Sequence, residues 1–187
     1  MPSWSRVATR SRVPLGFLFA AAYFWFARPT WTSLGAGFAV AAVGVLVRAL
    51  ASGHIRKNAE LATSGPYAYT RNPLYLGSII IAIGFIIAAR NIWIGIGALA
   101  MFAFIYMPVI TAEEKYLRSA FPGYDRYASE VPRFFPRLTP FRAAAEIDDS
   151  SAHFSSALYL RHREYNAALG AALMLGALVL KLLVKQH

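Results

Sequence analysis

Residues 65–89, GPYAYTRNPLYLGSIIIAIGFIIAA, set a polar, aromatic, turn-forming segment directly against the start of an apolar run. The run begins at Leu74 and contains no charged residue as far as Ala89. Pro73 suits the first position of a helix, and Asn72 before it can cap the helix start. The stretch therefore predicts an apolar membrane helix that is entered through a polar segment.

The composition of the whole chain supports a membrane protein. Of its 187 residues, 57% are hydrophobic and only 15% are charged, which is less charge than a soluble domain carries. Five apolar blocks without Asp or Glu recur along it, namely Val13–Ala27, Trp31–Leu50, Leu74–Ala89, Ile92–Thr111 and Tyr165–Val184. We therefore predict an all-α, polytopic membrane protein of one domain, residues 1–187, with about five transmembrane helices, the first and third of them short.

The basic residues orient the predicted helices. Most of them fall in three places: before block one, from the end of block two to block three, and between blocks four and five. The exceptions are Arg28, Arg90, Lys181 and Lys185. Since Lys and Arg collect on the cytoplasmic side of a membrane, we expect the amino terminus there. This basic face, beside anionic lipid head groups, accounts for the net charge of +10 without nucleic acid.

The segment after block four carries the glutamate pair Glu113-Glu114. Negative charge is unfavourable at a helix carboxyl end, so either the helix continues past Thr111 or the glutamates meet a cation. Pro108 is expected to open the helix nearby. The apolar repeat over Tyr116–Tyr124 predicts a short amphipathic helix on the membrane surface, broken or kinked at Pro122-Gly123.

Two other kinds of chemistry are excluded by the sequence. The chain has no cysteine, and His153 and His162 lie nine apart without a carboxylate pattern, so we predict no metal site. The string Gly95–Ala100 resembles a dinucleotide fingerprint, but it lies inside an apolar block without a preceding strand, so its glycines are assigned to helix packing. The same packing is predicted for Gly77 with Gly84 and for Gly170 with Gly176.

Arg71 is the leading candidate for ligand binding. Its planar guanidinium suits a carboxylate, and the free amide groups of a helix start also favour an anion. The neighbouring tyrosines, Tyr67, Tyr69 and Tyr75, could line a pocket for a flat ring or a sulfonium. Taken alone, the same tyrosines are better explained as an interfacial aromatic belt.

Three motifs follow one another in a fixed order between Gly53 and Leu138. They are Gly65-Pro66-Tyr67 with Arg71-Asn72-Pro73-Leu74-Tyr75-Leu76-Gly77; Glu113-Glu114 with Leu117, Phe121, Gly123, Tyr124 and Tyr127; and Val131-Pro132-Arg133 with Pro136. This order and spacing resemble the isoprenylcysteine carboxyl methyltransferase family and the related phospholipid N-methyltransferases. The resemblance implies a cofactor-binding core over residues 53–138. The composition after it predicts a linker over 139–164, and the last apolar block predicts a transmembrane helix over 165–184.

The resemblance also implies a cofactor and the residues that hold it. The cofactor is S-adenosylmethionine, which leaves as S-adenosylhomocysteine, in a site built from membrane helices and their cytoplasmic connections. The implied cofactor-binding residues are Tyr67, Tyr69, Arg71, Asn72, Tyr75, Glu113, Glu114, Tyr124, Tyr127 and Arg133. Arg71 and Glu114 are also the implied catalytic residues. Arg71 would hold the donor's carboxylate and a glutamate its ammonium or ribose, and Glu114 could accept a proton from an amine acceptor.

Three functions remain open from the sequence. The first is carboxyl methylation of an isoprenylcysteine-like or other lipophilic acceptor that arrives from the bilayer. The second is N-methylation of a phospholipid or amine, and the third is a non-catalytic membrane binding or assembly role. The expected location is a multi-pass position, in the inner membrane if the source is bacterial, with the active site on the cytoplasmic face. The oligomeric state is left open.

Overall fold

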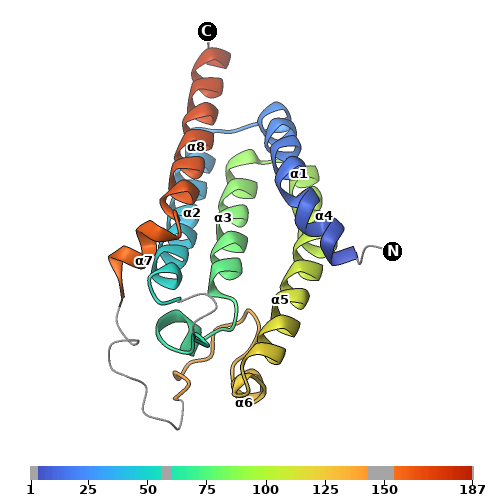
Figure 1. The fold of residues 1–187 in the computed structure, drawn as a ribbon. Coiled ribbons are helices and arrows are strands. Elements are labelled where there is room, and N and C mark those ends of the chain that lie inside the picture. Colours follow the sequence, from blue (N-terminus) through green and yellow to red (C-terminus); the bar gives the residue numbers. More distant parts are fainter. Residues whose placement is uncertain (1–3, 56–59, 143–153, 187) are drawn as a thin grey trace. The chain divides into compact units, whose positions relative to one another are not determined.

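The computed structural model describes residues 4–55, 60–142 and 154–186, and every regular element in those residues is helical. The elements are α1 (Trp4–Phe26), α2 (Trp31–Ser52), η1 (Gly65–Ala68), α3 (Pro73–Ala89), α4 (Ile92–Met101), η2 (Phe102–Tyr106), α5 (Met107–Ala120), α6 (Tyr124–Glu130), α7 (Ser156–Arg161) and α8 (Tyr165–Gln186) (Figure 1). The first η element is a 3-10 turn and the second is π-helical.

The apolar helices correspond to the five predicted blocks. Three are long and apolar enough to cross a membrane, namely Trp31–Ser52, Ile92–Ala120 and Tyr165–Lys185. Two shorter ones, Val13–Phe26 and Pro73–Ala89, match the blocks that are short in the sequence. The predicted all-α, polytopic membrane fold is therefore confirmed.

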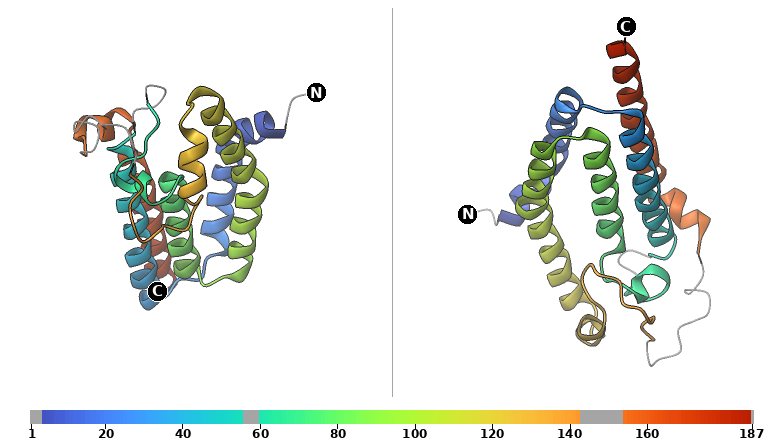
Figure 2. Two further views of the ribbon diagram at one scale, coloured as in Figure 1. Left: turned by 90° about the horizontal axis from the view of Figure 1, so that it is seen from below. Right: turned by 180° about the vertical axis from the view of Figure 1, so that it is seen from behind.

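The fourth block does not end at Thr111. Elements α4, η2 and α5 form one helical run, Ile92–Ala120, which Figure 2 shows without a break. The glutamate pair thus lies inside a helix, and the predicted separate surface helix over Tyr116–Tyr124 is wrong. Its first half is the end of α5. That helix continues through residues 112–120, where alanine, glutamate, lysine, leucine and arginine are strong helix formers. The predicted break at Pro122-Gly123 is confirmed, since α6 begins only at Tyr124.

Pro108 explains the π-helical turn that precedes it. Proline has no N–H to donate to the carbonyl four residues earlier, which is that of Phe104. The indole Nε1–H of Trp4 donates to the Phe104 carbonyl at 3.1 Å. Ala8 of α1 and Ile105 of η2 are buried in one small cluster beside this contact. The opening expected near Pro108 is thus present as a π turn, and α1 packs against it.

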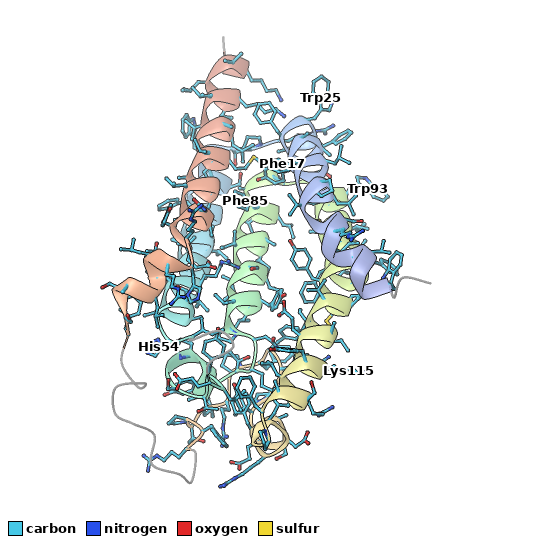
Figure 3. All side chains as sticks on the ribbon, viewed as in Figure 1. Phe17, Trp25, His54, Phe85, Trp93 and Lys115 are labelled. Atoms are coloured by element: carbon cyan, nitrogen blue, oxygen red, sulfur yellow. The ribbon has the colours of Figure 1, made fainter. Side chains whose placement is uncertain are left out.

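The chain divides into two compact units. The first contains Met1–Ala41, Ala82–Tyr116 and Ala172–His187, and the second contains Ala42–Ile81 and Leu117–Ala171. The core of the first unit consists of Tyr23, Ala27, Leu34, Ala88, Ala89, Ile94, Leu178 and Leu182. Tyr23 meets Phe85 edge to face at 5.6 Å, whereas Trp25 and Trp93 point outward (Figure 3). This outward aromatic exposure is expected for a helix end at a membrane surface.

Two tight turns and one lysine close the first unit. The Arg28 amide donates to the Ala89 carbonyl at 2.8 Å, and the Asn91 side chain donates to the Phe26 carbonyl at 3.0 Å. Lys181 Nζ, from α8, donates to the carbonyls of Phe24, Trp25 and Ala27. These carbonyls belong to the last turn of α1 and the residue after it, where a helix lacks internal donors. The one basic residue well inside an apolar block therefore acts as a helix cap.

The glycine predictions divide between right and wrong. In the second unit, a Cβ added to Gly77 would lie 2.7 Å from the Gly44 carbonyl, so α3 packs closely on α2 there. In the first unit, a Cβ on Gly84 would lie 2.6 Å from the Gly37 carbonyl. A Cβ on Gly97 would meet the Phe19 ring at 3.0 Å, whereas one on Gly95 would make ordinary contact with Ile86. The prediction that Gly170 and Gly176 pack closely on another helix is wrong, because a Cβ at either position meets nothing within 4 Å.

The predicted linker over 139–164 is only partly described. Residues 143–153, which include His153, lie outside the described residues. Phe141 is buried in the core of the second unit with Ala68, Tyr124, Tyr127 and Val131. Ser156–Arg161 forms α7, which the sequence did not predict. Ser155 caps α7 by accepting from the Leu158 amide.

Candidate functional site

The site is built around the start of α3 in the second unit. The Asn72 carbonyl accepts from the Leu76 amide at 2.9 Å, so Asn72 is the N-cap residue and Pro73 is the first helical residue, as predicted. Upstream, Gly65 has φ +54, a conformation that glycine adopts without strain. A Cβ at Gly65 would collide with the ring of His54. The chain thus enters α3 through a tight turn that only glycine fits.

A second segment runs beside this helix start. The Arg71 amide donates to the Pro132 carbonyl at 2.9 Å. The Thr70 hydroxyl and the Asn72 side-chain amide both donate to the Arg133 carbonyl, at 3.0 and 3.3 Å. Thr70 is only 2% exposed, so this pairing is buried. Two motifs about 60 residues apart in sequence are therefore joined by one backbone hydrogen bond and by two side chains that donate to a backbone carbonyl.

The pairing continues along the segment that precedes α3. The Arg137 amide donates to the Tyr69 carbonyl at 3.0 Å, and the Phe141 amide donates to the Ala68 carbonyl at 2.9 Å. The carbonyl before them, that of Tyr67, accepts from the Tyr127 hydroxyl at 2.7 Å. The carbonyls of Tyr67, Ala68 and Tyr69 thus each accept from a different donor. The segment is consequently fixed in position relative to α6 and residues 131–141.

Tyr127 lies at the centre of this arrangement. Its ring packs edge to face on Tyr124 at 6.2 Å and on Phe141 at 5.4 Å. Burial, and to a lesser extent the Tyr124 phenol, raise the pKa of Tyr127 above its ordinary value, while the charge of Arg71 acts in the opposite direction. Tyr127 therefore stays neutral at physiological pH and serves as a hydrogen-bond donor.

The structure brings most of the predicted site residues together in the second unit. These are Tyr67, Tyr69, Arg71, Asn72, Tyr75, Tyr124, Tyr127 and Arg133. Tyr67, Tyr124 and Tyr127 are buried, which gives them a packing role. Arg71, Asn72, Tyr75 and Arg133 are half-buried, and Tyr69 is 38% exposed. The two arginines, Asn72, Tyr69 and Tyr75 are thus the predicted site residues of this unit that keep some exposed surface, and their contact with a ligand stays a prediction.

Glu113 and Glu114 lie on α5, in the part of the chain that belongs to the first unit. Glu113 is exposed and Glu114 is half-buried. Successive residues of a helix point about 100° apart, so the two carboxylates project from different faces of α5. Their participation in the site stays a prediction.

The chemistry of the site residues in the second unit suits an anionic group beside an aromatic or cationic one. Two half-buried arginines beside a helix amino terminus favour a carboxylate. The rings of Tyr69 and Tyr75 suit a flat base or a sulfonium. Among the described residues, no group of three His, Asp or Glu side chains is placed to hold a metal ion.

Sequence reasoning missed one polar network of the second unit. Arg48 of α2 pairs with Glu164, which directly precedes α8, at 2.7 Å. In the sequence analysis Arg48 served only to orient the helices, and no role was predicted for Glu164. The available signal was a lone acid at the entry of the last apolar block, opposite an arginine inside the second helix.

Comparison with known proteins agrees with the motifs. The family model described as phospholipid methyltransferase matches residues 12–123. The cobalt-zinc-cadmium resistance protein CzcN of Cupriavidus metallidurans is 39% identical over 140 residues, which cover 70% of this chain and 64% of that protein. The nickel-cobalt-cadmium resistance protein NccN of Alcaligenes xylosoxydans xylosoxydans is 40% identical over 108 residues, covering 57% of this chain and 50% of that protein.

The chain thus spans between half and two thirds of the length of these curated relatives. No solved structure matches it. The family match extends from α1 to the break between α5 and α6, so it includes Arg71, Asn72 and Tyr75 at the start of α3 together with Glu113 and Glu114. Because that match covers more than half of the chain, the chain belongs to the phospholipid methyltransferase family.

Proposed function

We propose that the chain is an integral membrane methyltransferase that takes its methyl group from S-adenosylmethionine and transfers it to a lipophilic acceptor. The observation that carries the proposal is the set of hydrogen bonds from residues 70–72, one from the Arg71 backbone and two from side chains, to the carbonyls of Pro132 and Arg133. It gathers Arg71, Asn72 and Arg133 at the start of α3, in a chain of the phospholipid methyltransferase family. When bound, the donor supplies a methyl group on a sulfonium.

The residues have separate tasks in this proposal. Arg71 binds the donor's carboxylate, helped by the amide groups at the start of α3. Glu113 or Glu114 binds the ammonium or the ribose hydroxyls. The chain aligns donor and acceptor and keeps water out, and such alignment is worth several kcal/mol of the barrier. The buried tyrosines, Tyr67, Tyr124 and Tyr127, hold this surface in place.

The acceptor distinguishes two versions of the proposal. The first is carboxyl methylation of an isoprenylcysteine-like or other lipophilic acid, and a carboxylate acceptor needs no general base. The second is N-methylation of a phospholipid or amine, in which Glu114 accepts the proton that the amine loses. A mild-base treatment of the labelled product separates them, because a methyl ester is cleaved and an N-methyl group is not.

Binding of S-adenosylhomocysteine tests the proposal most directly. Calorimetry on the purified protein in detergent is expected to show binding by the parent and a loss of about tenfold or more for Arg71→Ala and Glu114→Ala. Arg126→Ala is the matched control, because Arg126 is exposed on α6 and pairs weakly with Glu130 at 3.6 Å. A parent chain that does not bind would leave the non-catalytic alternative, a membrane binding or assembly protein.

Activity and orientation require their own measurements. Incubation with labelled S-adenosylmethionine and a total lipid extract, followed by mass spectrometry, is expected to yield a labelled lipophilic product. Accessibility of single cysteines placed at Arg126 and Arg90 tests the proposed orientation, in which the Arg126 side faces the cytoplasm. The chain contains no native cysteine to interfere.

The names of the two relatives suggest where the activity is used. Both are named as metal resistance proteins. We infer that methylation by this chain contributes to growth in the presence of cobalt, zinc, nickel or cadmium. Cells that express the parent are expected to outgrow cells that express Arg71→Ala on these metals. Equal growth of the two would mean that methylation by this chain does not contribute to resistance.

A further inference from the structure

The side chain of Arg48 joins three segments of the second unit. Its Nε and Nη2 donate to one carboxylate oxygen of Glu164, at 3.1 and 2.7 Å. Its Nη1 donates to the Leu74 carbonyl at 3.2 Å and also to the Ser78 hydroxyl. Ser78 in turn donates to the Leu74 carbonyl at 3.0 Å. One guanidinium therefore connects the residue before α8 with the first turns of α3.

The fold makes room for this arginine. A Cβ added to Gly77 would lie 2.6 Å from Cγ of Arg48, so the arginine stem crosses α3 where α3 has no side chain. The side chains of Arg48 and Glu164 are 22% and 14% exposed. A pair that is this well covered is screened less by water and salt than a surface pair. The packing of α3 on α2 therefore accommodates the Arg48–Glu164 network.

The contacted turn is the one that follows Arg71 and Asn72. Leu74 is the second residue of α3, and its carbonyl is held from the side by Arg48. Residues 132–133 hold the other side of the helix start through Arg71 and Asn72. The first turn of α3 is therefore fixed by two independent sets of hydrogen bonds.

We propose that Arg48 is a positioning residue that fixes the first turn of α3, and that Glu164 holds Arg48 in that role. Glu164 lies outside residues 12–123, the part of the chain that the family model matches. The segment that enters α8 would thus complete a structure that begins within the matched part. The consequence for the methyl donor rests on the proposed function.

The physical reason is the alignment of the guanidinium. With Glu164 ionised, two of the guanidinium donors are taken by the carboxylate, which leaves Nη1 directed at α3. Among the described residues, Glu164 is the carboxylate that pairs with Arg48. Neutralising it leaves a covered guanidinium that gains by turning toward water. The Leu74 carbonyl and Ser78 hydroxyl then lose a charged donor.

Hydrogen exchange measures this positioning without any ligand. In Glu164→Gln, amides of the peptide Tyr69–Ser78 are expected to exchange faster than in the parent, by on the order of tenfold. Glu130→Gln is the matched control, because Glu130 is 44% exposed and pairs with Arg126 at 3.6 Å. Unchanged exchange of this peptide in Glu164→Gln would overturn the inference, whether or not the chain binds a methyl donor.

Binding of S-adenosylhomocysteine then tests the consequence for the site. Glu164→Gln and Arg48→Lys are expected to weaken it by roughly three- to tenfold, with Glu130→Gln unchanged. The double variant Arg48→Lys, Glu164→Gln should be no weaker than Arg48→Lys alone, because both changes act through one guanidinium. Independent, multiplying losses would contradict that mechanism.

Two outcomes separate this inference from the proposed function. If the parent does not bind S-adenosylhomocysteine, the proposed function fails and the exchange experiment still decides the role of Arg48. If the parent binds and Glu164→Gln binds equally well with unchanged exchange, the inference fails and the proposed function stands. Should Glu164→Gln not fold, Ser78→Ala removes one acceptor of Arg48 on α3 and is expected to speed exchange in the same peptide.

Discussion

The hydroxyl of Tyr127 donates a 2.7 Å hydrogen bond to the backbone carbonyl of Tyr67, 60 residues earlier in the chain. Both residues are buried, at 2% and 6% exposure. This bond ties α6 to the turn that precedes α3. It therefore connects the second half of the motif region to the helix start that carries Arg71.

Removing the Tyr127 hydroxyl is expected to destabilise the protein. Tyr127→Phe keeps the ring contacts with Tyr124 and Phe141 but takes the donor from the Tyr67 carbonyl. A buried carbonyl that loses its donor costs about 1–3 kcal/mol. Thermal unfolding in detergent should show a lower midpoint for Tyr127→Phe. Tyr165→Phe, at an exposed phenol on α8, should unfold like the parent.

The same phenol predicts how stability changes at alkaline pH. Burial raises the pKa of Tyr127, so the folded state keeps the proton at a pH where the unfolded state releases it. The contribution of this group to stability is complete below the unfolded pKa of about 10 and is lost as pH rises above it. The midpoint of the parent should therefore fall more steeply above pH 10 than that of Tyr127→Phe. Equal slopes in the two proteins would mean that the phenol ionises alike in both states.

The sequence predicted the helices from local signals. Blocks two, three and five differ from α2, α3 and α8 by two residues or fewer at each end. Those ends are marked by short-range chemistry, such as Pro73 at a helix start and Arg90 with φ 50 at a helix end. Block four ends at Thr111 by composition, and the sequence left open whether the helix continues past that residue; the structure shows that it does. A helix can leave the membrane without ending, and helix propensity carries α5 on to Ala120.

The pairing at the site could not be derived from residue types. The bonds from Arg71 to Pro132, from Arg137 to Tyr69 and from Phe141 to Ala68 join backbone groups that every residue except proline possesses. The resemblance to known methyltransferases implied that the three motifs share a site, and the structure joins the first of them to the last in the second unit. The link between Arg48 and Glu164 spans 116 residues, and neither local spacing nor the matched family region includes both partners.

Close packing of α3 on α2 predicts a sharp difference between two glycines. Gly77→Ala would place a Cβ 2.6 Å from Arg48 and 2.7 Å from the Gly44 carbonyl, and backbone atoms cannot give way cheaply. Overpacking of this kind costs about 1–3 kcal/mol. Gly170→Ala in α8 meets open space, so the gain in helix propensity should leave stability equal or slightly higher. Thermal unfolding of the two variants checks this, and equal losses would mean that space at Gly77 does not limit packing.

The contact between Trp4 and Phe104 predicts a coupled pair of substitutions in the first unit. Trp4→Phe removes the indole donor from the Phe104 carbonyl and should cost about 0.5–1.5 kcal/mol. The α-helical donor to that carbonyl would be the N–H of residue 108, which proline lacks. Pro108→Ala restores an N–H at this position, so Trp4→Phe should cost clearly less in the Pro108→Ala background than in the parent. A double-mutant cycle from thermal or denaturant unfolding measures the difference, with Trp31→Phe as the control for losing an exposed indole. If Trp4→Phe costs the same in both backgrounds, the indole contributes through ring packing on η2, and the π turn at Phe102–Tyr106 does not depend on its hydrogen bond.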